Sequence, residues 1–243
     1  MLTVVAGDLL ADRTGRQDSD VLALHGWMRT GADFARVLEG HDGLAVHLPG
    51  FGTTPPPPEA WGSEEYADHL AGALSGTGPY VVVGHSFGGR VAVRLAVRHP
   101  WLVRSLVLTG APLVRATPPP APALRVRVAK RLHAAHLLPT AVLERARRNA
   151  GSEDYRAAQG VMRDVFVRVV NEDYREDLAR IAVPVTMVWG ELDDSAPLAG
   201  ARLAADLVPG ARLEVVAGGG HLLTGDLEDR VAAALSEHLE RDR

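Results

Sequence analysis

Short apolar runs alternate with stretches of helical periodicity along most of this chain, and this alternation constrains the fold more than any other feature. The buried strands of a parallel sheet are apolar on both faces, so they read as short continuous apolar runs. We predict strands at residues 21–24, 44–46, 80–83, 102–108, 183–188 and 213–216. The periodicity between them predicts helices at residues 32–38, 63–74, 88–98, 198–207 and 226–241.

The fold class that follows is α/β. Parallel strands need crossover connections, and these place helices on both faces of an open, mostly parallel, doubly wound sheet. The first twenty residues are expected to add one or two edge strands around a turn at 12–15. A chain of 243 residues is long enough for one such domain with an insertion.

Residues 112–180 interrupt the alternation, because no convincing strand pattern occurs there. Prolines at positions 118–120 and 122 give a stiff entry into helix-rich sequence. We therefore predict a helical cap at 112–180, inserted into a core formed by residues 1–111 and 181–243.

The first part of this insertion is strongly basic. Its eight basic residues are Arg115, Arg125, Arg127, Lys130, Arg131, Arg145, Arg147 and Arg148. With one acid, Glu144, they give residues 112–150 a net charge of +7, and because the whole chain carries −4, the remainder carries −11. A solvated helix face is the common reason for such a run, and recruitment of an anionic substrate or an acidic carrier protein is the alternative.

Composition excludes several classes of protein. The chain has no cysteine, which rules out disulfides, thiolate metal sites and a cysteine nucleophile. A net charge of −4 gives no reason to expect nucleic acid or a membrane as partner. No apolar run is long enough to cross a membrane and no secretory signal is visible, so we expect a cytoplasmic protein.

A glycine-flanked serine is the strongest chemical signal. The sequence Gly84-His85-Ser86-Phe87-Gly88 lies directly between a predicted strand and a predicted helix. This is the context of the G-x-S-x-G nucleophile elbow, in which a sharp turn projects the serine hydroxyl from the edge of the sheet. Ser86 is therefore the candidate nucleophile, and a glycine-rich helix start that packs closely or binds an anion is the weaker interpretation.

A serine nucleophile needs a base, an acid that orients the base, and donors for the developing oxyanion. His221 is the candidate base, because it follows three glycines in a loop after the last predicted strand. The loop after the strand at 183–188 offers three acids, which are Glu191, Asp193 and Asp194. The expected oxyanion donors are the backbone amides of Phe87, after the nucleophile, and Trp27, after the first buried strand.

Taken together, these residues resemble the α/β-hydrolase superfamily over essentially the whole chain. The chain order of serine, acid and histidine matches, as do His25-Gly26 in the oxyanion loop and the Leu48-to-Gly52 segment. The resemblance implies that Asp193 is the acid, because in the family the acid commonly stands three residues after a glycine and four before a proline. A serine in the elbow argues against the dehalogenases and epoxide hydrolases of the family, which place aspartate there.

The function implied is that of a serine hydrolase that cleaves an ester or related acyl bond of a small-molecule acyl substrate, without metal or cofactor. Cleavage of a carbon–carbon bond on the same triad, or a lyase reaction, remains an alternative, and a non-catalytic binding protein is a weaker one. Expected substrate-binding residues are His25, Met28, Val161, Met162, Val165 and Phe166. His25 is also interpreted as ordering the oxyanion loop, and packing within the cap is an open alternative for the last four.

Overall fold

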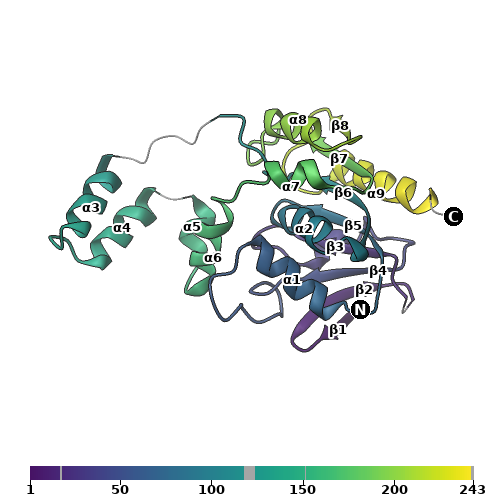
Figure 1. Cartoon of the computed structure of the whole chain (residues 1–243), viewed down its shortest axis with the longest axis horizontal. Coiled ribbons are helices and arrows are strands. Elements are labelled where there is room, and N and C mark those ends of the chain that lie inside the picture. Colours follow the sequence, from purple (N-terminus) through teal and green to yellow (C-terminus); the bar gives the residue numbers. More distant parts are fainter. Residues whose placement is uncertain (17, 118–123, 151, 242–243) are drawn as a thin grey trace.

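A computed structural model of the chain describes residues 1–16, 18–117, 124–150 and 152–241, without the side chains at 125, 126, 144, 146–148 and 150. Arg125, Arg147 and Arg148 of the predicted basic cluster therefore lie outside the described side chains. The centre of the molecule is one eight-stranded sheet with the order β1-β2-β4-β3-β5-β6-β7-β8 (Figure 1). Its strands are β1 (Leu2–Ala6), β2 (Leu9–Thr14), β3 (Val21–Leu24), β4 (Gly43–His47), β5 (Tyr80–His85), β6 (Val103–Thr109), β7 (Val185–Gly190) and β8 (Arg212–Val216).

The six strands from β4 to β8 along the sheet are parallel, and β2 is antiparallel to both of its neighbours. The predicted α/β class and mostly parallel sheet are therefore confirmed. Because parallel strands end at the same edge, the loops after β3, β5, β7 and β8 meet at one edge of the sheet.

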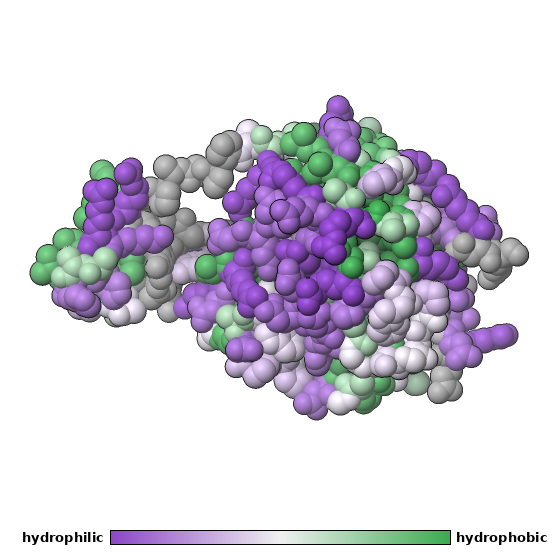
Figure 2. Space-filling view, viewed as in Figure 1, coloured by the Kyte–Doolittle hydropathy of each residue, from purple (hydrophilic) through white to green (hydrophobic). Residues whose placement is uncertain are grey.

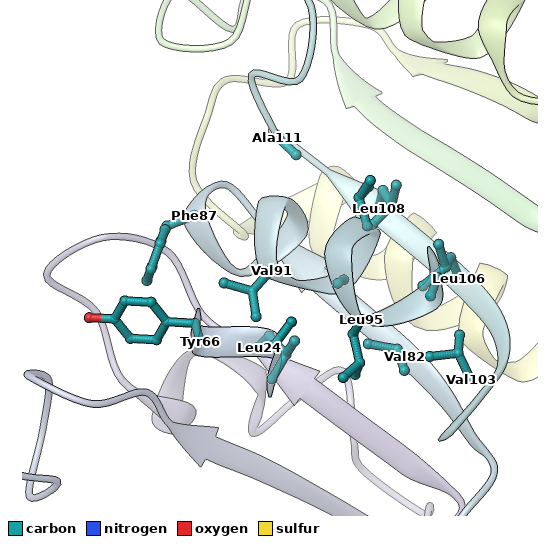
Figure 3. Close-up of a cluster of buried hydrophobic side chains, with 14 of the residues drawn as sticks. Leu24, Tyr66, Val82, Phe87, Val91, Leu95, Val103, Leu106, Leu108 and Ala111 are labelled. Carbon is teal, nitrogen blue, oxygen red and sulfur yellow. The ribbon is translucent and has the colours of Figure 1, made fainter. Parts of the chain in front are cut away.

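Helices cover both faces of this sheet. Helices α1 (Ser63–Ala73), α2 (Phe87–Arg98) and α8 (Leu198–Leu207) pack on one face, and α9 (Gly225–Glu240) packs on the other. Figure 3 shows how Val91 and Leu95 of α2 lie against Leu24, Val82 and Leu106 of the sheet. Each large aliphatic side chain buried in this way contributes about 1.5–3 kcal/mol to folding.

Two predictions at the edge of the fold are wrong. The N-terminal hairpin turns at Gly7 and Asp8, because Ala6 pairs with Leu9, whereas residues 12–14 belong to β2. Gly7 has a φ of +54°, which suits glycine. Asp12 lies in β2 between β1 and β4, and its carboxylate lies 2.9 Å from the Nε2 atom of His47. A polar cluster followed by glycine was therefore a misleading turn signal.

The predicted helix at 32–38 is also not an α-helix. The structure has a 3-10 helix at Gly31–Phe34 followed by turns, and the amides of Asp33 and Ala35 bond to carbonyl oxygens three residues earlier. Phe34, Val37 and Leu38 are buried under α9, so the spacing of apolar residues that predicted a helix reflects burial alone.

The segment between β6 and β7 is helical in all of its described elements. It contains α3 (Leu124–Ala134), α4 (Thr140–Ala150), α5 (Glu153–Ala157), α6 (Val161–Val169) and α7 (Arg175–Arg180). Helices α3 and α4 pack on each other and project away from the body, whereas α6 and α7 lie against it (Figure 1). We call α3 and α4 the arm. None of the helices among the described residues is long and apolar enough to cross a membrane.

Candidate active site

Ser86 occupies a strained turn between β5 and α2. Its backbone has φ of 51° and ψ of −112°, which a residue other than glycine rarely adopts. The glycines around it permit the turn: a Cβ atom on Gly84 would lie 2.7 Å from the Cα atom of Gly89, and one on Gly88 would lie 2.0 Å from the carbonyl oxygen of Leu24. The predicted strand, sharp turn and helix are thus present around Ser86.

His221 connects the serine to a carboxylate. Its Nε2 atom lies 3.2 Å from the hydroxyl oxygen of Ser86. Its Nδ1 atom lies 3.0 and 2.9 Å from the two carboxylate oxygens of Asp193. The loops that carry the two residues approach closely at Gly190, where a Cβ atom would lie 2.3 Å from the carbonyl oxygen of Gly220. The three side chains therefore form a continuous hydrogen-bonded series with the geometry required for proton transfer away from the serine.

Among the three acids of this loop, only Asp193 contacts His221. Its side chain is 1% exposed, and Oδ1 also accepts backbone hydrogen bonds from Ser195 at 3.0 Å and Ala196 at 2.7 Å. Glu191 instead accepts a hydrogen bond from the backbone of Gly218, and Asp194 bonds to the Ser195 hydroxyl. The fixed carboxylate of Asp193 can hold the imidazole in one tautomer, with the Nδ1 proton directed at the acid.

The loop after β3 places the candidate oxyanion donors. The Gly88 amide donates to the carbonyl oxygen of His25 at 2.9 Å, which ties this loop to the elbow. Within the described part of the chain, neither the Trp27 nor the Phe87 amide donates to a protein acceptor. Both N–H groups are thus available to a ligand beside Ser86, as an oxyanion site requires.

His25 orders the same loop. It is completely buried, its Nδ1 atom lies 2.7 Å from the Gly26 carbonyl oxygen, and its Nε2 atom accepts from the Leu48 amide at 3.0 Å. Burial lowers the pKa of His25 to about 4, so the ring is neutral and one nitrogen donates while the other accepts. Both ring nitrogens of His25 are bonded to backbone groups, so neither is left to bond to a substrate.

An aromatic cluster and a groove lie beside the oxyanion loop. The ring of Trp27 lies 4.9 Å from Phe51, 5.5 Å from Phe87 and 5.1 Å from Phe166 of α6. A groove of about 380 Å³ opens next to this cluster, lined by residues 27–30 and 50–52 from the body and by residues 157–159 and Met162 from the covering helices. Its volume is that of a site for a small organic ligand.

The structure separates the expected substrate-binding residues. Met28 and Met162 line the groove, and Phe166 contacts Trp27 at its side. Val165 is completely buried in the main core, and Val161 packs against that core. For Val161 and Val165, the alternative of packing within the protein therefore agrees with the structure better than substrate binding does.

Sequence reasoning missed Phe51 and His85. Phe51 lies in the glycine-flanked segment after β4 that marks the resemblance, and a buried aromatic residue there had no distinguishing signal. His85 is buried beside Ser86, with Nε2 at 2.9 Å from the carbonyl oxygen of His221. No group of three histidine, aspartate or glutamate side chains within the described residues could hold a metal ion.

Comparison with known proteins places this site in a family. Residues 21–234 match the profile described as "Alpha/beta hydrolase family". The chain belongs to the alpha/beta hydrolase family. A pimeloyl-[acyl-carrier protein] methyl ester esterase of Chromobacterium violaceum is 32% identical over 248 residues, covering 92% of this chain and 95% of that one. A 2-hydroxymuconate semialdehyde hydrolase of Pseudomonas putida is 37% identical over 84 residues, or 33% of this chain and 30% of its own.

A solved structure has the same fold as this alpha/beta hydrolase. An esterase from Exiguobacterium antarcticum superposes with a TM-score of 0.71 over 96% of this chain and 95% of its own, at 20% identity. That likeness shows the fold. The family and the relatives above show that this protein is a hydrolase.

Proposed function

We propose that this protein is a serine hydrolase that cleaves a carboxylic ester or a related acyl bond through an acyl-enzyme. The observation that carries the proposal is the hydrogen-bonded series from Ser86 through His221 to the buried Asp193. A serine hydroxyl is a weak nucleophile without a base, and this series supplies both the base and the group that orients it.

The proposed reaction has two halves. His221 removes the proton from Ser86 as the serine oxygen attacks the substrate carbonyl, and the amides of Trp27 and Phe87 stabilise the oxyanion that forms. His221 then gives its proton to the leaving alcohol, and the acyl-enzyme remains. Water, activated by the same histidine, attacks the acyl carbonyl and releases the acid. Asp193 stabilises the imidazolium in both halves.

The substrate we propose is a small acyl ester that occupies the groove beside Trp27. Met28 and Met162 contribute flexible apolar side chains to the groove, and no acidic side chain lines it. The helices between β6 and β7 would then act as the predicted cap, since α6 supplies Met162 to the groove and Phe166 to its aromatic border.

A second specific proposal is that the acyl group is presented by an acidic carrier protein. Two observations favour it: the relative that covers nearly the whole chain is an esterase of an acyl-carrier-protein ester, and residues 112–150 have a net charge of +7. Hydrophilic and hydrophobic residues adjoin on the surface of the arm (Figure 2). Arg127, Lys130 and Arg131 are exposed there, where a positive surface would attract an acidic partner.

Labelling with a fluorophosphonate tests the proposal, because the probe reacts only with an activated serine. We expect the wild-type protein to be labelled and Ser86→Ala to remain unlabelled. A panel of esters and carbon–carbon substrates then identifies the bond that is cleaved. Labelling that survives Ser86→Ala would overturn the assignment of Ser86 as the nucleophile. Turnover of carbon–carbon substrates but not of esters would replace ester cleavage by carbon–carbon bond cleavage. An absence of both labelling and turnover would support a binding protein.

A further inference from the structure

His85 lies at the end of β5, directly before Ser86, and is 2% exposed. Its Nε2 atom lies 2.9 Å from the carbonyl oxygen of His221. A carbonyl oxygen only accepts hydrogen bonds, so Nε2 of His85 carries the proton and donates it to the backbone of His221. The two imidazole rings lie 5.1 Å apart between centroids.

The other nitrogen of His85 faces the oxyanion loop. A Cβ atom on Gly26 would lie only 3.0 Å from Nδ1, and Nδ1 has no hydrogen-bond partner among the described residues. Burial lowers the pKa of His85 to about 4, and the bond to the His221 carbonyl offsets only part of that effect. The ring is therefore neutral and held in one tautomer near neutral pH.

The loop that carries His221 is rich in glycine, and its bonds to the loop after β7 hold Gly218 and Gly219 rather than the backbone of His221. Gly218, Gly219 and Gly220 precede the histidine, and Gly218 has a φ of +68° that favours glycine. Glycines leave a loop with wide conformational freedom, so backbone sterics alone do not fix the next residue. The Asp193 carboxylate holds the ring of His221 at Nδ1, and His85 holds its backbone at the carbonyl oxygen.

We propose that His85 is a positioning residue that fixes the backbone of His221, so that Nε2 of His221 is directed at the hydroxyl of Ser86. Because His85 and Ser86 are consecutive, the same short stretch of chain carries the nucleophile and holds the backbone of its base. The proposal rests on the proposed function, since it assigns His85 a role only if His221 is the base. A displacement of about 1 Å in a reacting group can lower a rate about 10²-fold.

The test compares two substitutions of His85 with a matched control. His85→Leu removes the donor and keeps an apolar side chain, whereas His85→Gln can place an amide N–H near the former Nε2 position. The control is His238→Leu, since His238 is also 2% exposed and bonds to the Thr186 hydroxyl at 2.8 Å, on the α9 face of the sheet. This control removes a buried histidine without touching the site.

We expect His85→Leu to lower kcat and the rate of fluorophosphonate labelling about 10²-fold with KM little changed. His85→Gln should restore most of that rate, and His238→Leu should keep the wild-type rate while losing thermal stability. Equal labelling rates in His85→Leu and the wild type overturn the proposal, as does a His85→Gln protein that is folded and as slow as His85→Leu. Failure of the wild type itself to react would instead overturn the proposed function.

Discussion

The two parts of the helical segment between β6 and β7 differ in what they contact. The part that contains α6 and α7 is bonded to the body: Glu172, between the two helices, lies 2.6 Å from the hydroxyl of Ser63 on α1, and Arg94 of α2 pairs with Asp177 of α7. The arm packs mainly on itself.

The exposed apolar residues of the arm reinforce this difference. Leu124, Val128 and Leu132 recur every four residues on α3, and their exposed fractions are 73%, 45% and 38%. They form a stripe on one face of that helix. In α6, by contrast, Val165 and Val169 are buried and Phe166 reaches Trp27. A run of helices in the sequence can thus combine a part that packs on the body beside the groove with a part whose apolar residues stay exposed.

Of all the changes considered, loss of the proposed triad of Ser86, His221 and Asp193 should have the largest effect on activity. We expect Asp193→Asn to lower kcat about 10⁴-fold, because the amide favours the wrong tautomer of His221. Asp194→Asn is the matched control, and it should cost far less since Asp194 is exposed and does not contact His221. Steady-state kinetics on a small ester measure both, and the reverse ranking would move the acid by one residue.

The two buried histidines of the body predict a loss of stability in acid. The pKa values of His25 and His85 are lowered to about 4 by burial, so in the window between about 6.5 and 4 the unfolded chain binds protons that the folded protein does not. Stability is therefore full above this window and falls as pH falls through it, by up to about 1.4 kcal/mol per pH unit for each histidine. Urea unfolding at several pH values measures the slope, and a slope in His85→Gln as steep as in the wild type would contradict the contribution of that residue.

If α6 belongs to the site, loss of the contact between Phe166 and Trp27 should lower the rate with a small substrate, even one that does not contact the arm. Phe166→Ala removes the ring that lies 5.1 Å from Trp27. An aromatic pair contributes about 0.5–1.5 kcal/mol beyond its buried area, so kcat/KM should fall by up to about tenfold. Val128→Ala on the arm is the control, and equal losses in the two variants would remove the distinction between the parts.

The bonds between the body and the part that contains α6 and α7 should stabilise the folded protein. Glu172→Gln removes the carboxylate that Ser63 and Tyr174 share, and we expect unfolding to become easier by about 1–3 kcal/mol. Lys130→Gln on the exposed arm should change stability by less than about 0.5 kcal/mol. Chemical denaturation of both variants measures the difference, and similar values would show that the polar contacts of Glu172 contribute little.

The smallest expected effect is that of the arm on a small neutral ester. Combined replacement of Arg127, Lys130 and Arg131 by glutamine should leave kcat/KM for that ester unchanged. For an ester linked to an acidic carrier protein, the wild-type rate should fall with rising salt, and the triple variant should be slower and less salt-dependent. If the rate is independent of salt for every substrate, including the carrier-linked ester, the basic residues form only a solvated helix face.

The sequence predicted features that depend on one segment or on family spacing, and missed those that depend on contacts. The strands and the turn at Ser86 follow from local apolar runs and glycines, and the structure brings His221 and Asp193 to that serine. The hairpin turn was misplaced because Asp12 pairs with β4 and contacts His47 there, more than thirty positions away along the chain. The roles of Phe51 and His85 could not be read for the same reason, since each depends on loops that are distant in sequence.

The floor of the groove has a consequence for substrate range. Gly50 has a φ of +92°, and a Cβ atom there would lie 2.3 Å from the sulfur of Met162. The positive φ favours glycine at position 50, and the absence of a side chain there leaves the space that the flexible thioether of Met162 fills. If the proposed substrate occupies this groove, shortening Met162 would make room for a bulkier one, whereas Gly50 has no side chain that could be shortened.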